Sequence, residues 1–584
     1  MTGFQFLLSL FFCIVIDNFK NASSEVYSSE EFVEFNRYKE PTVFIAILVR
    51  NKAQTLPFFL TCLERLKYSK SRIHLWIRSD HNEDKSIEIL QEWLAEWAAH
   101  YHGVDAEFSS SPPYRLPEEN GPAHWPLSRY SHIISLREKA LNAARNMWAD
   151  FVWLLDSDVF LSMPESLTEL VKKQLPIAVP MLKSDGLYSN FWCGMNDDYY
   201  YLRTDDYEPI LNQKKTGCFS VPMVHSAVLI NLNVEQSDEL TFMPNRLANY
   251  KGPHDDIITF ALSANFTGVP LFICNDHIYG YVMVPLDKDD SLSYDKLQLT
   301  NLRLEIMVDS PPLEVSGLLK HWVDVPAVDH LGVDRVFMIN LLRRPERRRR
   351  MNECFRILGV NATVVDAVDG QLLNDSTLQE MGVHLMEGYV DPYHKRFFQC
   401  CRPMKRGEIG CFLSHYYIWK EILEDDSLDK VIVLEDDVRF EPFFRQKMDS
   451  ILSELEKFEI PWDLVYLGRK RLQEAEESTF PGSQYLVYPN YSYWTLGYML
   501  SKSGAKKLMD ANPLDNLLPV DEFLPILYDK HPDENWKSYF PKRDVLALSA
   551  EPLIIYPTRY LHEEGYVSDT EDSLPISTTP RIDL

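Results

Sequence analysis

The chain has 584 residues, of which 45% are hydrophobic and 25% are charged, so it is long enough for two or three domains with large buried cores. Its formal net charge of -27 argues against a nucleic-acid partner, because proteins that grip nucleic-acid phosphates need a basic face. The same acidic excess repels a free nucleotide diphosphate, so it favours phosphate binding through a metal ion.

The chain begins with a short apolar run from Phe4 to Ile16 that ends at Asp17. This run is too short to cross a bilayer comfortably and is typical of a signal-peptide core, so residues 1–22 are predicted to be a signal peptide. An N-terminal core helix is the alternative. No later stretch approaches a membrane span, so the protein is not expected to span a membrane.

Two further features favour the secretory route and the lumen of the endoplasmic reticulum. The chain carries acceptor sequons for N-glycosylation at Asn21, Asn265, Asn361, Asn374 and Asn490. Its last four residues, Arg581 to Leu584, resemble a K-D-E-L retrieval signal but carry Ile582 where an acid is expected. The 9 cysteines allow disulfides in that compartment, but the sequence does not give their pairing.

Three kinds of segment occur twice and in the same order along the chain. The first is an apolar run closed by arginine, the second is an apolar run that ends in acids, and the third is an acid pair that opens a helix-like stretch. The pairs are 43–50 with 336–343, 151–158 with 431–437, and 254–257 with 520–523. This duplication predicts two α/β domains. The expected boundaries are 40–300 and 330–560, with a linker at 301–329 and a flexible tail at 567–584.

Acidic residues follow two of the predicted strands directly. Asp156 and Asp158 match the D-x-D pattern, and Glu435 and Asp437 have the same spacing with Asp436 between them. Ligands of parallel sheets bind at the carboxyl ends of the strands, and oxygen ligands suit Mg²⁺ or Mn²⁺. A metal there would offset the charge of a departing diphosphate. The alternative is that these acids are turn residues and helix caps.

Two patterns in the second half have a functional and a structural explanation each. Arg343, Arg344 and the run 347–350 either contact phosphate or form a solvated face. The aromatic cluster 491–494, which includes Trp494, either stacks on a sugar ring or packs in a core.

The second half of the chain resembles glycosyltransferase family 25. The resemblance rests on R-V-F-M-I-N-L-L-R-R-P-E-R-R (335–348), D-A-V-D-G (366–370), K-R-G-E-I-G-C-F-L-S-H (405–415), V-I-V-L-E-D-D-V-R-F-E-P (431–442) and L-P-V-D-E-F-L-P (518–525). The whole chain, including Y-V-S-D-T-E-D at 566–572, is similar to the animal procollagen galactosyltransferases of that family. Those enzymes resemble GT-A folds. The expected fold is therefore α/β with two tandem GT-A-like (Rossmann-like) nucleotide-sugar-binding domains.

This resemblance implies transfer of galactose from UDP-galactose to hydroxylysine in collagen or procollagen chains, with inversion to a β linkage and with Mn²⁺ (or Mg²⁺). A single displacement needs a general base, for which Asp521 and Glu522 are the candidates. The metal and diphosphate are assigned to Glu435, Asp436 and Asp437, with Asp156 and Asp158 as a second metal set. The expected donor-binding residues are Asn340, Arg344, Asp366, Asp369, Glu408, Ser414, His415 and Trp494.

Several alternatives stay open at the level of the sequence. The N-terminal domain either binds a nucleotide sugar or positions collagen, and the family motifs favour the C-terminal domain as the one that carries transfer. A catalytically silent collagen-binding or cell-adhesion paralogue, and a transferase of another hexose, are the alternative functions. The oligomeric state, including a homodimer, is also open.

Overall fold

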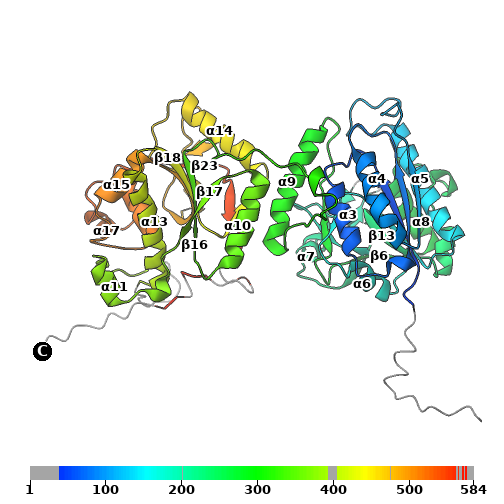
Figure 1. Cartoon of the computed structure of the whole chain (residues 1–584), viewed down its shortest axis with the longest axis horizontal. Helices are drawn as coiled ribbons and strands as arrows, with labels where there is room; N and C mark the ends of the chain where they lie inside the picture. The colour runs from blue at the N-terminus through cyan, green and yellow to red at the C-terminus, as the bar shows by residue number, and fades with distance from the viewer. Residues whose placement is uncertain are drawn as a thin grey trace, which may run out of the picture.

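The computed structural model shows two α/β units in one chain (Figure 1). The described residues are 39–391 without 197 and 200, 404–560 without 474, and 563, 568–570, 573 and 574. The predicted signal peptide, the sequon at Asn21 and the C-terminal tetrapeptide lie outside the described residues.

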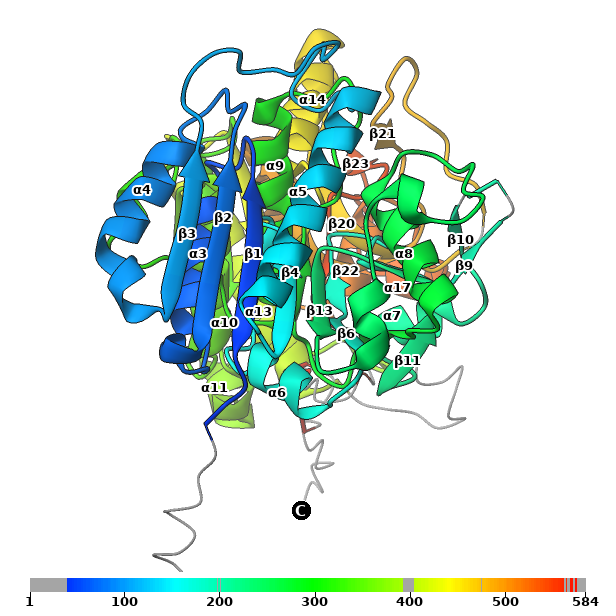
Figure 2. The ribbon, with the colours of Figure 1, turned by 90° about the vertical axis from the view of Figure 1, so that its right-hand side faces the viewer.

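The N-terminal unit is built on an eight-stranded mixed sheet with the order β11-β14-β6-β13-β4-β1-β2-β3. Its strands are β1 (Val43–Val49), β2 (Ile73–Ser79), β3 (Gly103–Phe108), β4 (Phe151–Leu155), β6 (Ile177–Pro180), β11 (Cys218–Val221), β13 (Ala227–Asn231) and β14 (Leu271–Cys274). β1 to β4 run parallel, whereas β13 runs antiparallel to β4 and to β6. Figure 2 shows β1, β2 and β3 side by side. The carboxyl ends of β1, β2 and β4 therefore share one edge of the sheet.

Helices cover both faces of this sheet, which explains why its central strands are continuous apolar runs. Val43, Ile45 and Ile47 point to one face and Phe44 and Ala46 to the other, since side chains alternate along a strand. The first face packs against α3 (Leu56–Arg65), α4 (Ser86–Trp97) and α6 (Ser166–Lys172), and the second against α5 (Leu127–Asn146), α7 (Tyr207–Leu211) and α8 (Asp256–Thr267).

The C-terminal unit has a seven-stranded mixed sheet with the order β17-β16-β18-β22-β20-β23-β21. Its strands are β16 (Arg335–Asn340), β17 (Ala362–Asp366), β18 (Lys430–Leu434), β20 (Leu464–Arg471), β21 (Leu486–Val487), β22 (Ser492–Ser501) and β23 (Ala547–Ala550). The run β17-β16-β18-β22-β20-β23 repeats the order and the strand directions of β2-β1-β4-β13-β6-β14. The predicted α/β fold with two tandem domains is confirmed by this repeat.

Two layers of helices also enclose the second sheet. Phe337 and Ile339 pack on one face, and Val336 and Met338 pack on the other. The first face is covered by α11 (Asp375–Glu380), α13 (Arg406–Glu424), α15 (Lys502–Asp510), α16 (Val520–Leu527) and α17 (Glu534–Ser538), and the second by α10 (Pro345–Leu358) and α14 (Phe444–Lys457).

Short elements complete the two units. The minor strands are β5 (Val159–Leu161), β7 (Leu182–Lys183), β8 (Phe191–Trp192), β9 (Gly194–Met195), β10 (Tyr201–Leu202), β12 (Met223–Val224), β15 (Gly280–Val282), β19 (Val438–Phe440) and β24 (Ile555–Pro557). The 3₁₀ helices are η1 (Lys70–Arg72), η2 (Ala98–His100), η3 (Glu235–Glu239), η4 (Pro244–Arg246), η5 (Lys320–Trp322) and η6 (Gly370–Leu372).

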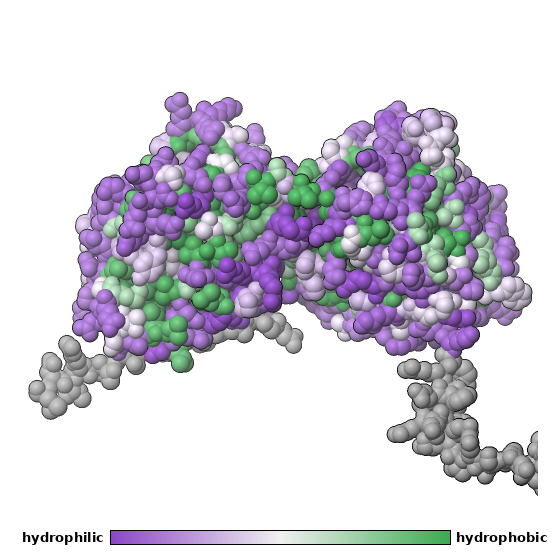
Figure 3. Space-filling view, viewed as in Figure 1, coloured by the Kyte–Doolittle hydropathy of each residue, from purple (hydrophilic) through white to green (hydrophobic). Residues whose placement is uncertain are grey.

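One helix, α9 (Leu292–Asp309), lies between the two units (Figure 1). Its Leu299, Leu302 and Ile306 pack in a cluster of the N-terminal unit, whereas Leu304 and Met307 pack in the core of the C-terminal unit. Residues 301–309, which were assigned to the linker, are the last turns of this helix. The space-filling view shows the two lobes meeting at a narrower waist (Figure 3).

Polar contacts fix α9 to both units. The Phe443 N–H donates to Asn301 Oδ1 at 2.8 Å. The carboxylate of Asp309 lies 2.8 Å from Lys183 Nζ of the first unit and 2.7 Å from Arg559 Nη2 of the second. Both domains are thus bonded to the same helix.

The structure supplies a disulfide that the sequence left open. Cys218 of β11 is bonded to Cys274 of β14, so an edge strand is tied covalently to its neighbour. Within the described ranges, no helix combines the length and the apolar character that crossing a bilayer requires. Of the predicted glycosylation sites, Asn265, Asn361 and Asn374 are exposed and Asn490 is half-buried.

Candidate active site

The acids predicted to hold a metal follow β18 directly and line a cavity of about 110 Å³ in the C-terminal unit. The cavity is also lined by Arg343 and Arg347 and by Ser414 and His415 of α13. Glu435, Asp436 and Asp437 all reach it from the carboxyl edge of the sheet. Carboxylates and guanidinium groups therefore face the same small space.

Asp436 is held by both of its carboxylate oxygens. The Asn340 side-chain amide donates to Asp436 Oδ2 at 2.7 Å, and Arg347 Nη1 donates to Asp436 Oδ1 at 3.1 Å. Burial raises the pKa of Asp436 even though Arg347 opposes that rise. Because its oxygens are engaged with the first strand and helix of the unit, Asp436 joins β18 to the Asn340–Arg347 segment.

Glu435 has a different environment. The Thr495 hydroxyl donates to Glu435 Oε1 at 2.6 Å, and His415 Nε2 lies 3.5 Å from the same oxygen. Although burial alone would raise it, the imidazole of His415 and the Thr495 hydroxyl hold the pKa of Glu435 below its ordinary value. Burial and the charge of Glu435 raise the pKa of Asp437 to about 6.

The donor atoms around Glu435 fit a divalent cation. Cys411 Sγ, a ring nitrogen of His415 and an oxygen of Glu435 all lie within 4.8 Å of one another. The buried Nε2 of His415 has no hydrogen-bond partner among the described residues. His415 Nδ1 is 2.9 Å from the Tyr498 hydroxyl, which also accepts from the Trp419 indole at 3.0 Å, so the ring is held in place. Cys411 was not among the predicted site residues.

The two candidate bases, Asp521 and Glu522, open helix α16 but differ in surroundings. Glu522 is buried, and it accepts hydrogen bonds from Tyr491 at 2.6 Å and Tyr493 at 2.5 Å and lies 2.9 Å from His531 Nε2. Three of the about four lone-pair sites of this carboxylate are thus already engaged, which makes it the poorer candidate for taking a proton from an acceptor hydroxyl.

Asp521 is instead influenced by the charge of Glu435, which follows β18. Burial and the charges of Glu435 and Glu522 raise the pKa of Asp521 well above its ordinary value, while the Trp494 backbone N–H donates to its carboxylate. Its buried Oδ1 has no hydrogen-bond partner among the described residues. Trp494 has a left-handed backbone with φ of 74°, an unusual state for a bulky residue that commonly marks a functional site.

The remaining predicted donor-binding residues differ in their location: two line the cavity, one is exposed and one caps a helix. Ser414 accepts from the Val368 N–H at 2.9 Å and lines the cavity, and Asp369 lines it while accepting from Arg343 Nε at 2.9 Å. Asp366 is exposed at the end of β17, 3.7 Å from Arg348. Glu408 accepts from the Lys405 N–H at 2.6 Å and so caps the start of α13.

The C-terminal segment contributes a residue that was not predicted. Asp569 lines the cavity and accepts from Arg344 Nε at 2.9 Å and from Arg343 Nη1 at 2.5 Å. The tail was expected to be flexible from residue 567, yet its described residues pack here: the Gly407 N–H donates to Ser573 Oγ at 2.9 Å. The only signal in the sequence was the Y-V-S-D-T-E-D segment itself, which has no local pattern of a binding site.

The N-terminal unit has a larger cavity of about 470 Å³ at the corresponding edge of its sheet. Asp156 and Asp158 line it after β4, as the duplication predicts. Each is bound to a basic residue: Asp156 pairs with Arg137 of α5, and Asp158 Oδ2 lies 2.8 Å from Lys52 Nζ. Although burial alone would lower it, the charges of Asp158 and Asp295 hold the pKa of Lys52 above its ordinary value.

The acid pair at 255–256 is also brought to this cavity. Asp255 caps α8 by accepting from the Ile257 and Ile258 N–H groups. Burial raises the pKa of Asp256 to about 6, although Arg137 lies 3.6 Å away. The repeat therefore places similar acids at both sheet edges, and each set has basic partners that no sequence pattern had indicated: Arg137 and Lys52 in the N-terminal unit and Arg347 in the C-terminal unit.

Comparison with known proteins assigns both units. Residues 40–303 match the model of the glycosyltransferase family 25 N-terminal domain, and residues 333–524 match that of glycosyltransferase family 25 (LPS biosynthesis protein). This chain belongs to glycosyltransferase family 25. The family resemblance inferred from the sequence is thereby confirmed, and the chain is a family 25 enzyme.

Family 25 relatives align over nearly the whole chain. A glycosyltransferase 25 family member of Anopheles gambiae is 51% identical over 92% of this chain and 90% of its own. Human procollagen galactosyltransferase 2 is 46% identical over 92% of this chain and 84% of its own. Among solved structures, Staphylococcus aureus TarS residues 1-349 in complex with UDP-GlcNAc aligns with a TM-score of 0.28 and 12% identity over 46% of this chain and 67% of its own.

Proposed function

We propose that this family 25 enzyme transfers galactose from UDP-galactose to hydroxylysine of collagen or procollagen chains, by inversion and with Mn²⁺ or Mg²⁺, in the lumen of the endoplasmic reticulum. The proposed acceptor and donor follow from the 46% identity to procollagen galactosyltransferases of human and frog over 92% and 94% of the chain. The compartment follows from the signal-peptide-like start, the sequons and the disulfide.

The observation that carries the proposal is the acid cluster that follows β18. Glu435 and Asp437 share a cavity with Arg343 and Arg347, so carboxylates that suit a dication lie beside guanidinium groups that suit phosphate. A cation held by Glu435 with His415, and by Asp437, would neutralise a bound diphosphate and favour its departure from the sugar. The C-terminal domain is therefore the proposed site of transfer.

The residues of this domain divide the remaining tasks. Arg343 and Arg347 bind phosphate oxygens, and Ser414 holds the Val368 loop against α13 so that the cavity keeps its shape. Asp521 takes the proton of the acceptor hydroxyl as general base, because Glu522 is already engaged by two tyrosines and His531. Burial and the charge of Glu435 raise the pKa of Asp521, and a dication held at Glu435 would oppose that rise and favour the ionised form that this role needs.

One assay tests donor, acceptor and domain together. The purified full chain is incubated with a hydroxylysine-containing collagen peptide, Mn²⁺ and a panel of UDP-sugars, and the peptide mass is measured. We expect a gain of one hexose with UDP-galactose and a loss of at least about 100-fold in rate for Asp437→Asn.

Asp158→Asn is the matched control, since it neutralises the equivalent acid of the N-terminal unit. Transfer that survives Asp437→Asn but not Asp158→Asn would move the reaction to the N-terminal domain. Collagen binding without release of UDP from any UDP-sugar would instead identify a catalytically silent binding protein.

A further inference from the structure

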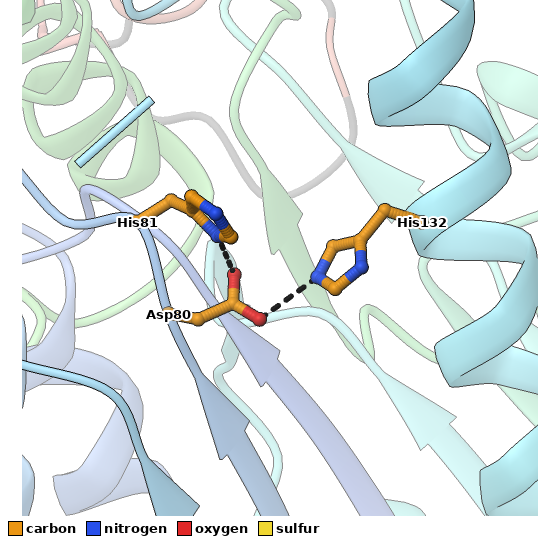
Figure 4. Close-up of side chains that lie close together, drawn as sticks. All are labelled: Asp80, His81 and His132. Carbon is orange, nitrogen blue, oxygen red and sulfur yellow. Dashed lines mark hydrogen bonds and ion pairs between the residues drawn. The ribbon is translucent and has the colours of Figure 1, made fainter. Parts of the chain in front are cut away.

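Three metal-ligand side chains converge in the N-terminal unit, at the end of β2 and on α5, apart from the acids that follow β4. Asp80 Oδ1 lies 2.7 Å from His81 Nδ1, and Asp80 Oδ2 lies 2.8 Å from His132 Nε2. Figure 4 shows both rings pointing at the same carboxylate. We infer that Asp80, His81 and His132 form a binding site for a transition-metal dication of the zinc class.

The fold builds this site from two elements. Asp80 is the first residue after β2, at the sheet edge where the carboxyl ends of β1 and β2 meet, and His132 projects from the early turns of α5. The edge opens on the cavity of about 470 Å³, which Asp80 and His132 both line. Residues distant in sequence are thus positioned by a strand and a helix, which are rigid supports for a ligand set.

His81 is held in an uncommon backbone state. Its φ of 51° lies in the left-handed region, which few non-glycine residues adopt although histidine does so more often than most. Arg50 Nε donates to the His81 carbonyl at 3.0 Å, and Arg50 is itself bound by Glu119 through contacts of 2.8 and 2.5 Å. These contacts fix the peptide that turns the His81 ring toward Asp80.

The donor set suits a transition metal better than Mg²⁺. Two imidazole nitrogens and one carboxylate oxygen are preferred by Zn²⁺ and its neighbours, whereas Mg²⁺ prefers oxygen alone. The three side chains are 19% to 29% exposed, so a fourth position can face the cavity. Ligands about 2.0 Å from one tetrahedral ion lie about 3.3 Å apart. The two histidines contact different oxygens of Asp80, but one carboxylate oxygen and one ring nitrogen of each histidine all lie within 4.8 Å of one another, so a modest rearrangement brings them around one ion.

The neighbouring acids make a different kind of site. Asp156 pairs with Arg137 and Asp158 pairs with Lys52, so basic side chains already stand where a cation would bind. The contacts of Asp80 come from imidazoles, which become metal ligands when they lose a ring proton. The Asp80 group therefore offers imidazole ligands that the D-x-D pair lacks.

The test is a metal titration of the full chain. Protein purified in the presence of a chelator is exchanged into metal-free buffer, and Zn²⁺ binding is followed by isothermal titration and by elemental analysis after dialysis. Co²⁺ serves as a second probe, because its visible spectrum reports nitrogen ligands. Circular dichroism of each metal-free variant verifies its fold.

The variants are chosen to spare the backbone. His81→Asn keeps a residue that tolerates the left-handed state, and His132→Ala removes a ligand from a helix surface. His277→Ala, an exposed histidine beside Asp276, is the matched control. His415→Asn identifies any zinc held by the Cys411 group, and the Asp156→Asn, Asp158→Asn double variant tests the D-x-D pair.

We expect His81→Asn and His132→Ala each to lose one equivalent of Zn²⁺, or to bind it at least about 100-fold more weakly, which exceeds the effect of removing an outer-shell partner. His277→Ala and the Asp156, Asp158 variant should keep that equivalent. Equal zinc content and affinity in the parent chain, His81→Asn and His132→Ala would show that the three side chains form a hydrogen-bonded network only, and the inference would be overturned. If His132→Ala fails to fold, His81→Asn decides alone.

Discussion

Arg344 and Asp569 are joined by two hydrogen bonds of 2.9 Å although 225 residues separate them in the chain. The arginine leads into the first helix of the C-terminal domain, and the aspartate belongs to the tail. Although burial alone would raise it, Arg344 and Arg343 hold the pKa of Asp569 below its ordinary value. An internal carboxylate therefore lies among the arginines assigned to phosphate.

This pair predicts that Asp569 keeps the tail against α13. In Asp569→Asn the charge that binds Arg343 and Arg344 is lost, so the contacts of the Arg406 and Gly407 N–H groups with residues 574 and 573 open more often. We expect hydrogen exchange at those two amides to accelerate about tenfold, which corresponds to about 1.4 kcal/mol. Asp426→Asn, at a fully exposed acid, should leave the exchange unchanged. Unaltered protection in Asp569→Asn would contradict the role.

Asp521 and Glu522 should give opposite kinds of defect. Asp521→Asn is expected to slow transfer by about 10²- to 10⁴-fold while the affinity for UDP stays within about twofold, because only proton removal is lost. Glu522→Gln is expected to lower thermal stability by about 1–3 kcal/mol, because Tyr491, Tyr493 and His531 lose a charged acceptor. We test this difference by measuring the transfer rate, the affinity for UDP and the thermal stability of both variants. A normal rate in Asp521→Asn would remove it as the base.

Lys52 should contribute more to the free energy of unfolding of the N-terminal unit than a surface lysine does. Lys52→Met leaves Asp158 without its partner at 2.8 Å, and Asp295 loses a nearby positive charge. We expect a cost of about 1–3 kcal/mol in the N-terminal unit, since a half-buried ion pair is broken on one side only. Adding Asp158→Asn should recover part of that loss, and a double-mutant cycle of thermal melts measures the coupling. Strictly additive effects would mean that the two side chains do not interact.

His225 should make the N-terminal unit sensitive to acid. Burial holds the pKa of His225 at about 4, below its ordinary value of 6.5, although Asp156 and Asp158 favour the charged form. Between these values the unfolded chain binds a proton here and the folded chain does not, so stability is complete above pH 6.5 and is lost as the pH falls toward 4. The contribution lost at pH 5 is about 2 kcal/mol.

The measurement for His225 is the melting temperature at pH 7 and at pH 5. The drop between the two should be about 4–8 °C smaller in His225→Gln than in the parent chain. His277→Gln, which removes an exposed histidine, is the control and should follow the parent. The same drop in all three proteins would show that the His225 proton is not linked to folding.

The strands and their acidic ends could be predicted because both are local. The apolar runs 151–155 and 431–434 became β4 and β18 with almost the same bounds, and a buried strand must end where carboxylates begin. Contacts between residues that are distant in the sequence could not be predicted, because no local pattern marks them. The pairing of Arg344 with Asp569, and of Asp158 with Lys52, depends on which loops meet at a sheet edge.

The choice between Asp521 and Glu522 was beyond the sequence for the same reason. In the sequence, two adjacent acids at the start of a helix are equally good candidates for the base. They are distinguished by Tyr491 and Tyr493, at the start of β22 and in the turn before it, which donate hydrogen bonds to Glu522. The Asp80 group was missed because its acid and its second histidine lie 52 residues apart. Histidine pairs at that spacing have no helical or strand periodicity to reveal them.

The position of α9 determines where the chain can be divided into separate domains. Leu304 and Met307 fill the hydrophobic core of the C-terminal domain, yet they belong to a helix whose other side completes the N-terminal domain. A fragment that begins at residue 333, where the second family region starts, would lack both side chains and expose the apolar surface beneath them. Truncation at that boundary would therefore yield an aggregating piece, and isolated halves should be designed to share residues 292–309.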